Sequence, residues 1–233
     1  MPEAGRSRLR PFPVELRGRN GVDRRRVAHL DLLAIDSFDR LIEAADRYCC
    51  EARLVTTSSA NNLTPVGEGD HVIGADAPRL TLVEYGDFGC PHCFAASRPV
   101  MTLLDRFDGL RLVWRHLPDP EVHPGADLAA ELSELAAVHG KFWEAHALLL
   151  TGRQAFSHED LLATARNLEL DADEAKTALD ERTFRPRVLI DVESGKRARA
   201  RGTPTFFIDG ERVDGPWRRL AEIVPARLQG AGA

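Results

Sequence analysis

The chain has 233 residues, enough for one large domain or for one domain with an additional segment. Its 43% hydrophobic and 29% charged residues are typical of a globular protein with a sizeable core. A net charge of −5 gives no general reason to expect a nucleic-acid partner. Four cysteines in a chain of this length exclude a disulfide-stapled scaffold. No run approaches the roughly 18–20 apolar residues of a transmembrane segment.

The first 67 residues predict an arm and a short helix rather than a defined domain. Residues 1–26 contain eight arginines and little apolar periodicity, which indicates a solvated arm. Residues 37–53 predict a helix, with Cys49 and Cys50 near its end. We expect ordinary thiols there; a redox-relay or metal-binding role is the alternative. Residues 56–79 are rich in turn formers, so we expect a linker and place the domain boundary near residue 68.

The N-terminal sequence is a poor match to a secretory signal peptide. The apolar run at residues 27–35 contains His29 and Asp31, and no small-residue cleavage site follows it. As written, the chain is therefore expected in the cytoplasm, and outside it if the true start differs.

Residues 68–233 predict an α/β domain. Residues 80–85 and 110–117 have the pattern of strands, and residues 93–107, which include Pro99, have that of a helix. A β-α-β unit of this length implies parallel strands and a right-handed crossover. Five short helical segments follow between about residues 125 and 201, which indicates an inserted helical subdomain.

The α/β pattern returns after this insertion. Residues 202–210 predict a strand that ends in Asp-Gly, a hairpin signal, and residues 211–213 its short partner. Residues 216–228 predict a terminal helix. The expected order is therefore β-α-β, helical insertion, β-β-α.

The motif Cys90-Pro91-His92-Cys93 lies at the junction between the first strand and its helix. A thiol at a helix N-terminus faces unpaired N–H groups and the positive end of the dipole, so its thiolate is favoured. The thiolate attacks in disulfide exchange, and a cysteine one turn on can release the partner. We therefore expect Cys90 to be the nucleophile and Cys93 the more buried resolving thiol, with His92 stabilising the thiolate.

A zinc site is the main alternative for this motif. Such sites usually need a second Cys/His pair at similar spacing, and the other cysteines and histidines do not provide one. We therefore expect no metal and no cofactor other than a redox-active Cys90–Cys93 disulfide.

Two further positions are candidates for the same site. Glu84 lies in a strand expected to be buried on both faces, where desolvation would raise its pKa and suit it to exchange a proton with Cys93. The alternative is an edge position in water. Thr203-Pro204 opens an interior-looking strand, which is unusual for proline. A cis bond there would leave the Thr203 backbone free to pair with an extended substrate, but spacing alone leaves cis and trans both open.

Taken together, these features resemble the DsbA-like branch of the thioredoxin superfamily. The matching pieces are the first strand, Cys-Pro-His-Cys, the internal Pro99, the helical insertion and Gly-Thr-Pro-Thr-Phe-Phe at residues 202–207. The chain is especially similar to a bacterial subgroup that occurs as free proteins and as tails of NhaA-type sodium/proton antiporters. That similarity rests on residues 70–93, His116-Leu-Pro118, Phe142-Trp-Glu144 and residues 202–207.

The resemblance covers about residues 68–228 and implies a thioredoxin-like fold. It implies Cys90 as nucleophile, Cys93 as resolving cysteine, a cis Pro204 beside them and Glu84 as the buried acid. The implied activity is thiol–disulfide exchange with protein substrates and an unidentified recycling partner. Cys-Pro-His-Cys is the form found in DsbA-type oxidases, so the oxidase direction is favoured, although a cytoplasmic address would favour reduction. The alternative is a redox or docking module that regulates a membrane transporter or another partner.

Overall fold

The computed structural model describes residues 62–230. The chain divides into two units, residues 1–58 and 59–233, and every element named below belongs to the second. The expected arm at residues 1–26 and the expected helix at residues 37–53, with Cys49 and Cys50, lie outside the described residues. Within residues 62–230 no helix is both long and apolar enough to cross a membrane.

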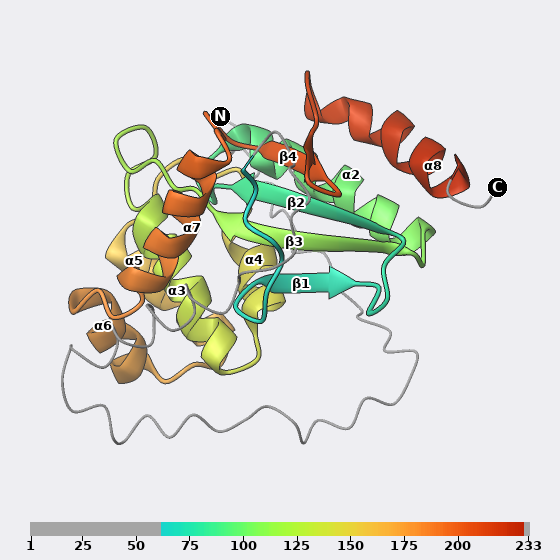
Figure 1. The fold of residues 1–233 in the computed structure, drawn as a ribbon. Helices are drawn as coiled ribbons and strands as arrows, with labels where there is room; N and C mark the ends of the chain where they lie inside the picture. Colours follow the sequence, from blue (N-terminus) through green and yellow to red (C-terminus); the bar gives the residue numbers. More distant parts are fainter. Residues whose placement is uncertain (1–61, 231–233) are drawn as a thin grey trace, which may run out of the picture. The chain divides into compact units, whose positions relative to one another are not determined.

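The described residues contain one sheet, with strand order β1-β3-β2-β4-β5 (Figure 1). Strands β2 and β3 run parallel to each other, and every other pair of neighbouring strands runs antiparallel. The strands are β1 (His71–Gly74), β2 (Leu80–Gly86), β3 (Leu110–His116), β4 (Thr205–Ile208) and β5 (Glu211–Arg212). The first of them was not predicted, because its four residues lie among glycines and prolines that indicate a linker.

Helix α2 (Pro91–Arg106) connects the two parallel strands, as the β-α-β pattern predicts, and it runs through Pro99 without interruption. Five helices then form the insertion: α3 (Ala126–Val138), α4 (Phe142–Leu149), α5 (His158–Asn167), α6 (Ala172–Asp180) and α7 (Arg185–Arg197). A short 3-10 turn, η2 (Trp217–Arg219), leads into the terminal helix α8 (Leu220–Gly230). The thioredoxin-like α/β fold with a helical insertion is thus confirmed.

Side chains of β2 alternate between the two faces of the sheet, as in any strand. Leu80 and Leu82 join a core cluster with residues of α2 and α8. Val83 and Tyr85 join a different cluster, with Phe207 of β4 and Ala198 at the end of α7. By this alternation Glu84 belongs to the α2 face of the sheet and its neighbour Tyr85 to the α7 face.

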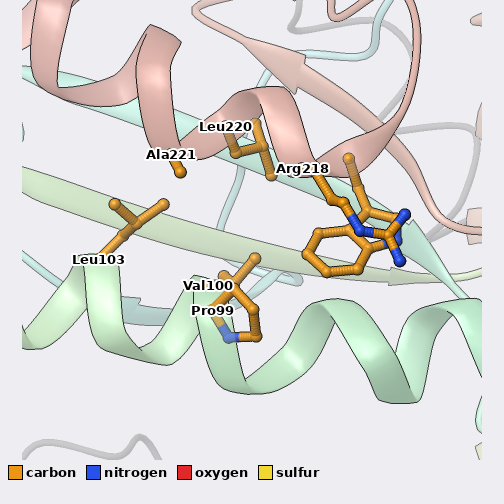
Figure 2. A pocket seen from close by; sticks show the side chains of 7 residues that line it. Pro99, Val100, Leu103, Arg218, Leu220 and Ala221 are labelled. Atoms are coloured by element: carbon orange, nitrogen blue, oxygen red, sulfur yellow. The ribbon is translucent and has the colours of Figure 1, made fainter.

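An apolar cavity of about 210 Å³ lies where α2 meets α8. Pro99, Val100 and Leu103 of α2 face Leu220 and Ala221 of α8 across it (Figure 2). Its polar contribution comes from Arg218, whose guanidinium lies 4.7 Å from the centre of the Trp217 ring. None of the residues that line this cavity is a nucleophile or an acid, so the cavity is a poor candidate for a catalytic site.

Candidate active site

The Cys-Pro-His-Cys motif forms the start of α2. Cys90 is the N-cap residue and Cys93 lies in the first turn. Both thiols are free and buried, with 4% and 0% of their surfaces exposed. The strand reaches this turn through Gly86, where a Cβ atom would lie 2.1 Å from the Trp114 ring, so only glycine permits the approach.

The two thiols have opposite pKa shifts. The pKa of Cys90 falls to about 5, chiefly because the Cys93 thiol hydrogen-bonds to it; Thr203 and the backbone N–H groups of Cys93 and His92 add to the effect, against the cost of burial. The pKa of Cys93 rises, because of burial first and then because its hydrogen bond to Cys90 and the nearby charges of Glu84 and Cys90 favour the protonated form. Near neutral pH the pair therefore holds one thiolate and one thiol.

Glu84 supplies a buried acid on the same face of the sheet. Its side chain is 2% exposed, as expected for a strand covered on both faces, and burial together with the negative charge of Cys90 raises its pKa to about 8. Among the described residues its Oε1 atom has no hydrogen-bond partner. A carboxyl group in this state can hold or release a proton close to neutral pH.

The Thr203-Pro204 segment, which directly precedes β4, lies next to Cys90. Its peptide bond is cis, and Sγ of Cys90 lies 3.2 Å from the carbonyl oxygen of Thr203, to which it donates a hydrogen bond in its protonated form. A groove of about 80 Å³ runs from Pro204 along β4, and Arg212, Asp214 and Trp217 form part of its lining. The segment thus links Cys90, through Thr203, to a groove that begins at the next residue, Pro204.

Comparison with known proteins identifies the family to which this fold belongs. A family model described as thioredoxin matches residues 67–224, more than half of the chain. The chain belongs to the thioredoxin family.

Curated relatives of this thioredoxin-family chain include proteins named Na(+)/H(+) antiporter NhaA. It is 40% identical over 178 residues to NhaA 3 of Salinispora tropica and 41% identical over 178 residues to NhaA 1 of Salinispora arenicola. Both matches cover 71% of this chain but only 27% of the relative. The chain therefore spans about a quarter of the length of these relatives, and the resemblance to the antiporter-associated subgroup is confirmed for that part alone.

Solved structures show the same fold. A thioredoxin-like oxidoreductase from Silicibacter pomeroyi is 25% identical, with a TM-score of 0.58, and the match covers 75% of this chain and 99% of that one. BdbD from Bacillus subtilis is 22% identical, with a TM-score of 0.62 and coverage of 71% and 96%. The thiol-disulfide exchange protein alpha-DsbA2 from Wolbachia pipientis is 17% identical, with a TM-score of 0.57 and coverage of 68% and 87%. Identities this low support the thioredoxin fold rather than a shared substrate.

The two middle residues of the Cys-Pro-His-Cys motif are exposed to solvent. Pro91 and His92 are exposed at the start of α2. The contribution of His92 to the pKa of Cys90 comes from its backbone N–H, whereas the sequence suggested its side chain. These two residues are exposed to solvent, whereas Glu84 and Cys93 are buried.

One group near the site was not found from the sequence. His71, His116 and Glu134 bring their ligand atoms within 4.8 Å of one another. The Trp114 indole donates to Nδ1 of His116, at 3.1 Å, so Nε2 carries the proton and faces Glu134 at 3.0 Å. That ring therefore offers no free lone pair to a cation, and the three residues form a hydrogen-bonded group. Successive members of the group are 45 and 18 positions apart in sequence, so no short-range spacing reveals it.

Proposed function

We propose that the chain catalyses thiol–disulfide exchange between the Cys90/Cys93 pair and protein substrates. The observation that carries this proposal is the opposite pKa shift of the two thiols, about 5 for Cys90 and a raised value for Cys93. A thiolate at the surface-facing end of the motif and a protonated thiol beneath it are the division of labour that exchange requires.

The proposed reaction runs in the oxidase direction. A thiolate with a lowered pKa stabilises the reduced form and leaves readily, which makes the Cys90–Cys93 disulfide a strong oxidant. A substrate thiolate attacks Sγ of Cys90, the Cys90–Cys93 bond breaks, and its electron pair goes to Cys93. A second substrate thiolate then attacks the substrate sulfur of the mixed disulfide and releases Cys90 as a thiolate. Two electrons pass from substrate to the pair, so no bound cofactor is needed.

Glu84 is proposed as the proton donor and acceptor of Cys93. The negative charge of Glu84 is among the causes that raise the pKa of Cys93, and burial is what raises the pKa of Glu84 to about 8. A carboxylic acid that is mostly protonated at pH 7 can deliver a proton as Cys93 leaves and take it back when Cys93 attacks.

The Thr203-Pro204 segment is proposed as the substrate-binding edge. The Thr203 carbonyl oxygen already accepts a hydrogen bond beside Cys90, and the groove along Pro204 continues from that point. An extended peptide whose cysteine approaches Cys90 can pair with this backbone.

The exchange proposal is tested with cysteine variants and a reduced peptide that carries two thiols. Cys90→Ser is expected to abolish oxidation of the peptide. Cys93→Ser, mixed instead with the disulfide form of the peptide, is expected to accumulate a mixed disulfide at Cys90, detected by mass spectrometry, because the Cys90 thiolate can attack that disulfide but no second cysteine resolves the product. His139→Leu, in a half-exposed His–Glu pair, serves as an unrelated control. Peptide oxidation by Cys90→Ser at the rate of the unaltered protein would sink the proposal.

A docking module is the second candidate, and the NhaA names of the curated relatives favour it. In that case the chain would regulate a membrane transporter rather than act as a general catalyst. The double variant Cys90→Ser/Cys93→Ser discriminates between the two in cells. If the double variant fails to replace the unaltered chain in cells that depend on it, the result supports exchange. If it replaces the chain fully, the result supports docking.

A further inference from the structure

The carboxylate of Asp87 is a buried junction next to the thiols. Its side chain is fully enclosed, and its two oxygens accept hydrogen bonds from three separate donors. Oδ1 accepts the backbone N–H of Gly89 at 2.7 Å. Oδ2 accepts the backbone N–H of Asp119 at 3.0 Å and pairs with Nδ1 of His123 at 2.8 Å. The carboxylate therefore joins the turn before Cys90 to the loop between β3 and α3.

The backbone of Asp87 contacts both cysteines. Its N–H donates to Sγ of Cys93 at 3.5 Å, and its carbonyl oxygen accepts the N–H of Cys90 at 3.1 Å. The hydrogen bond to Cys93 opposes the rise in the pKa of that thiol. Any shift of the Asp87 peptide thus moves the donor to Sγ of Cys93 and the acceptor that holds the backbone of Cys90.

His123 is held tightly against this turn. A Cβ atom on Gly89 would lie 2.5 Å from Cβ of His123, so the histidine packs directly on the glycine backbone that precedes Cys90. Its own backbone is fixed by an N–H bond to Asp119 at 2.7 Å and a carbonyl bond from Ala126 at 3.0 Å. Only 12% of its side chain is exposed.

From these contacts we propose that His123 is a positioning residue of the thiol pair and acts through Asp87. The Nδ1–H group of His123 holds the Asp87 carboxylate, and the Asp87 backbone in turn fixes Cys90 and donates to Cys93. Without that donor the Asp87 carboxylate keeps only two backbone partners, and the turn that holds the Cys90 backbone and donates to Sγ of Cys93 loosens. The reduced form is then less stabilised, so the disulfide becomes a weaker oxidant. This role rests on the proposed exchange function.

The test is the equilibrium of the full chain with reduced and oxidised glutathione. His123→Leu removes the donor, and we expect the equilibrium constant for oxidation of the protein dithiol to rise by about three- to tenfold, where tenfold corresponds to about 30 mV. Alkylation of Cys90 by iodoacetamide at pH 5 should slow in parallel, because less thiolate is present. His139→Leu removes a histidine from another carboxylate pair, at Glu174, and should leave both readouts unchanged.

Two polar variants keep the test decisive if His123→Leu does not fold. Asparagine can place its amide N–H where Nδ1 lies, whereas glutamine extends past that point. We therefore expect His123→Asn to stay within about twofold of the unaltered protein and His123→Gln to shift as His123→Leu does. Equal values for all variants would overturn the positioning role, and so would a shift in His123→Asn as large as in His123→Gln. An unaltered protein that oxidises no peptide would overturn the exchange function instead, since the glutathione equilibrium is measured without a substrate.

Discussion

Two groups of buried polar side chains lie on opposite faces of β2, and they differ in how completely they are paired. On the α2 face Glu84 lies near the thiols with one oxygen that has no hydrogen-bond partner among the described residues. On the α7 face Arg115 donates to both oxygens of Asp70, to Oη of Tyr85 and to the carbonyl oxygens of Thr64 and Pro65. We call this second group, with Ser194 bound to Tyr85, the Arg115 cluster.

The difference in pairing distinguishes Glu84, which we propose exchanges protons, from a structural group. Burial alone would lower the pKa of Arg115, but the hydrogen bonds and charge of Asp70 raise it above its usual range, so this side chain stays charged. Burial of Glu84 is not offset by partners, so its pKa rises to about 8, within the range where thiols exchange protons. Removing one partner of a paired buried charge destabilises the fold, whereas a buried acid without partners has a raised pKa that suits it to proton exchange.

The largest effect is expected from breaking the Arg115 cluster. Arg115→Met leaves the Asp70 carboxylate, whose side chain is 9% exposed, with the Gly67 N–H but without its charged partner, and it removes the contacts to residues 64 and 65. Loss of one member of a buried ion pair costs roughly 3–5 kcal/mol. We expect the free energy of unfolding to fall by about this amount in urea titrations, with the Cys90 alkylation rate of the folded protein unchanged.

Arg227→Met is a matched control for this substitution. Arg227 pairs with Glu211 at the surface, where both side chains are largely exposed. Exposed pairs contribute about 0–1 kcal/mol, so the control should be almost as stable as the unaltered protein. An equally small loss for Arg115→Met would contradict the structural role of the cluster.

Glu84→Gln probes the unpaired group through the pH dependence of stability. Between pH 4.5 and 8 the unfolded chain releases the Glu84 proton while the folded chain retains it, so the native state binds more protons and loses stability as the pH rises. The amide that replaces the carboxyl group has no proton to lose in this range. The variant should therefore be more stable than the unaltered protein with reduced cysteines. This difference in unfolding free energy should grow by about 1.4 kcal/mol per pH unit and reach on the order of 3 kcal/mol at pH 7.

This gain is measured as the difference in unfolding free energy at pH 4.5, 6 and 7. Glu222→Gln on the exposed side of α8 controls for the loss of a carboxylate. A difference between Glu84→Gln and the unaltered protein that stays constant over this range would mean that Glu84 is ionised in the folded state. The proposed proton exchange with Cys93 would then lose its support.

The sequence predicted the parts of the molecule that depend on neighbours along the chain. Strand alternation and helical periodicity located β2, β3 and α2, and the two-residue spacing of the cysteines singled out the turn at the start of α2, for which we propose disulfide exchange. Burial of Glu84 followed from a strand covered on both faces. The long-range pairs were beyond reach: Arg115 meets Asp70 across 45 positions, and His123 meets Asp87 across 36. No periodicity records such contacts, and the same is true of the edge strand β1, whose residues look like a linker until β3 pairs with them.

The smallest effect is expected from Tyr85→Phe, which tests the comparison at neighbouring residues of one strand. The substitution removes the hydroxyl that pairs with Ser194 and accepts an N–H of Arg115 at 3.1 Å, but it keeps the ring that packs against Phe207. Each of these hydrogen bonds is worth about 0.5–1.5 kcal/mol net, and Arg115 retains its other acceptors. We expect a loss of about 1 kcal/mol in unfolding free energy.

The redox readouts decide what this small loss means. Tyr85 is adjacent to Glu84 in sequence but belongs to the other face of the sheet, so the alkylation rate of Cys90 and the glutathione equilibrium should not change with Tyr85→Phe. A change in either would show that the Arg115 cluster reaches the thiols through β2. Unchanged redox values with reduced stability would mean that the two groups act independently. Neighbouring residues of one strand point to opposite faces of the sheet, so the Tyr85 hydroxyl and the Glu84 carboxyl group lie on different sides of it.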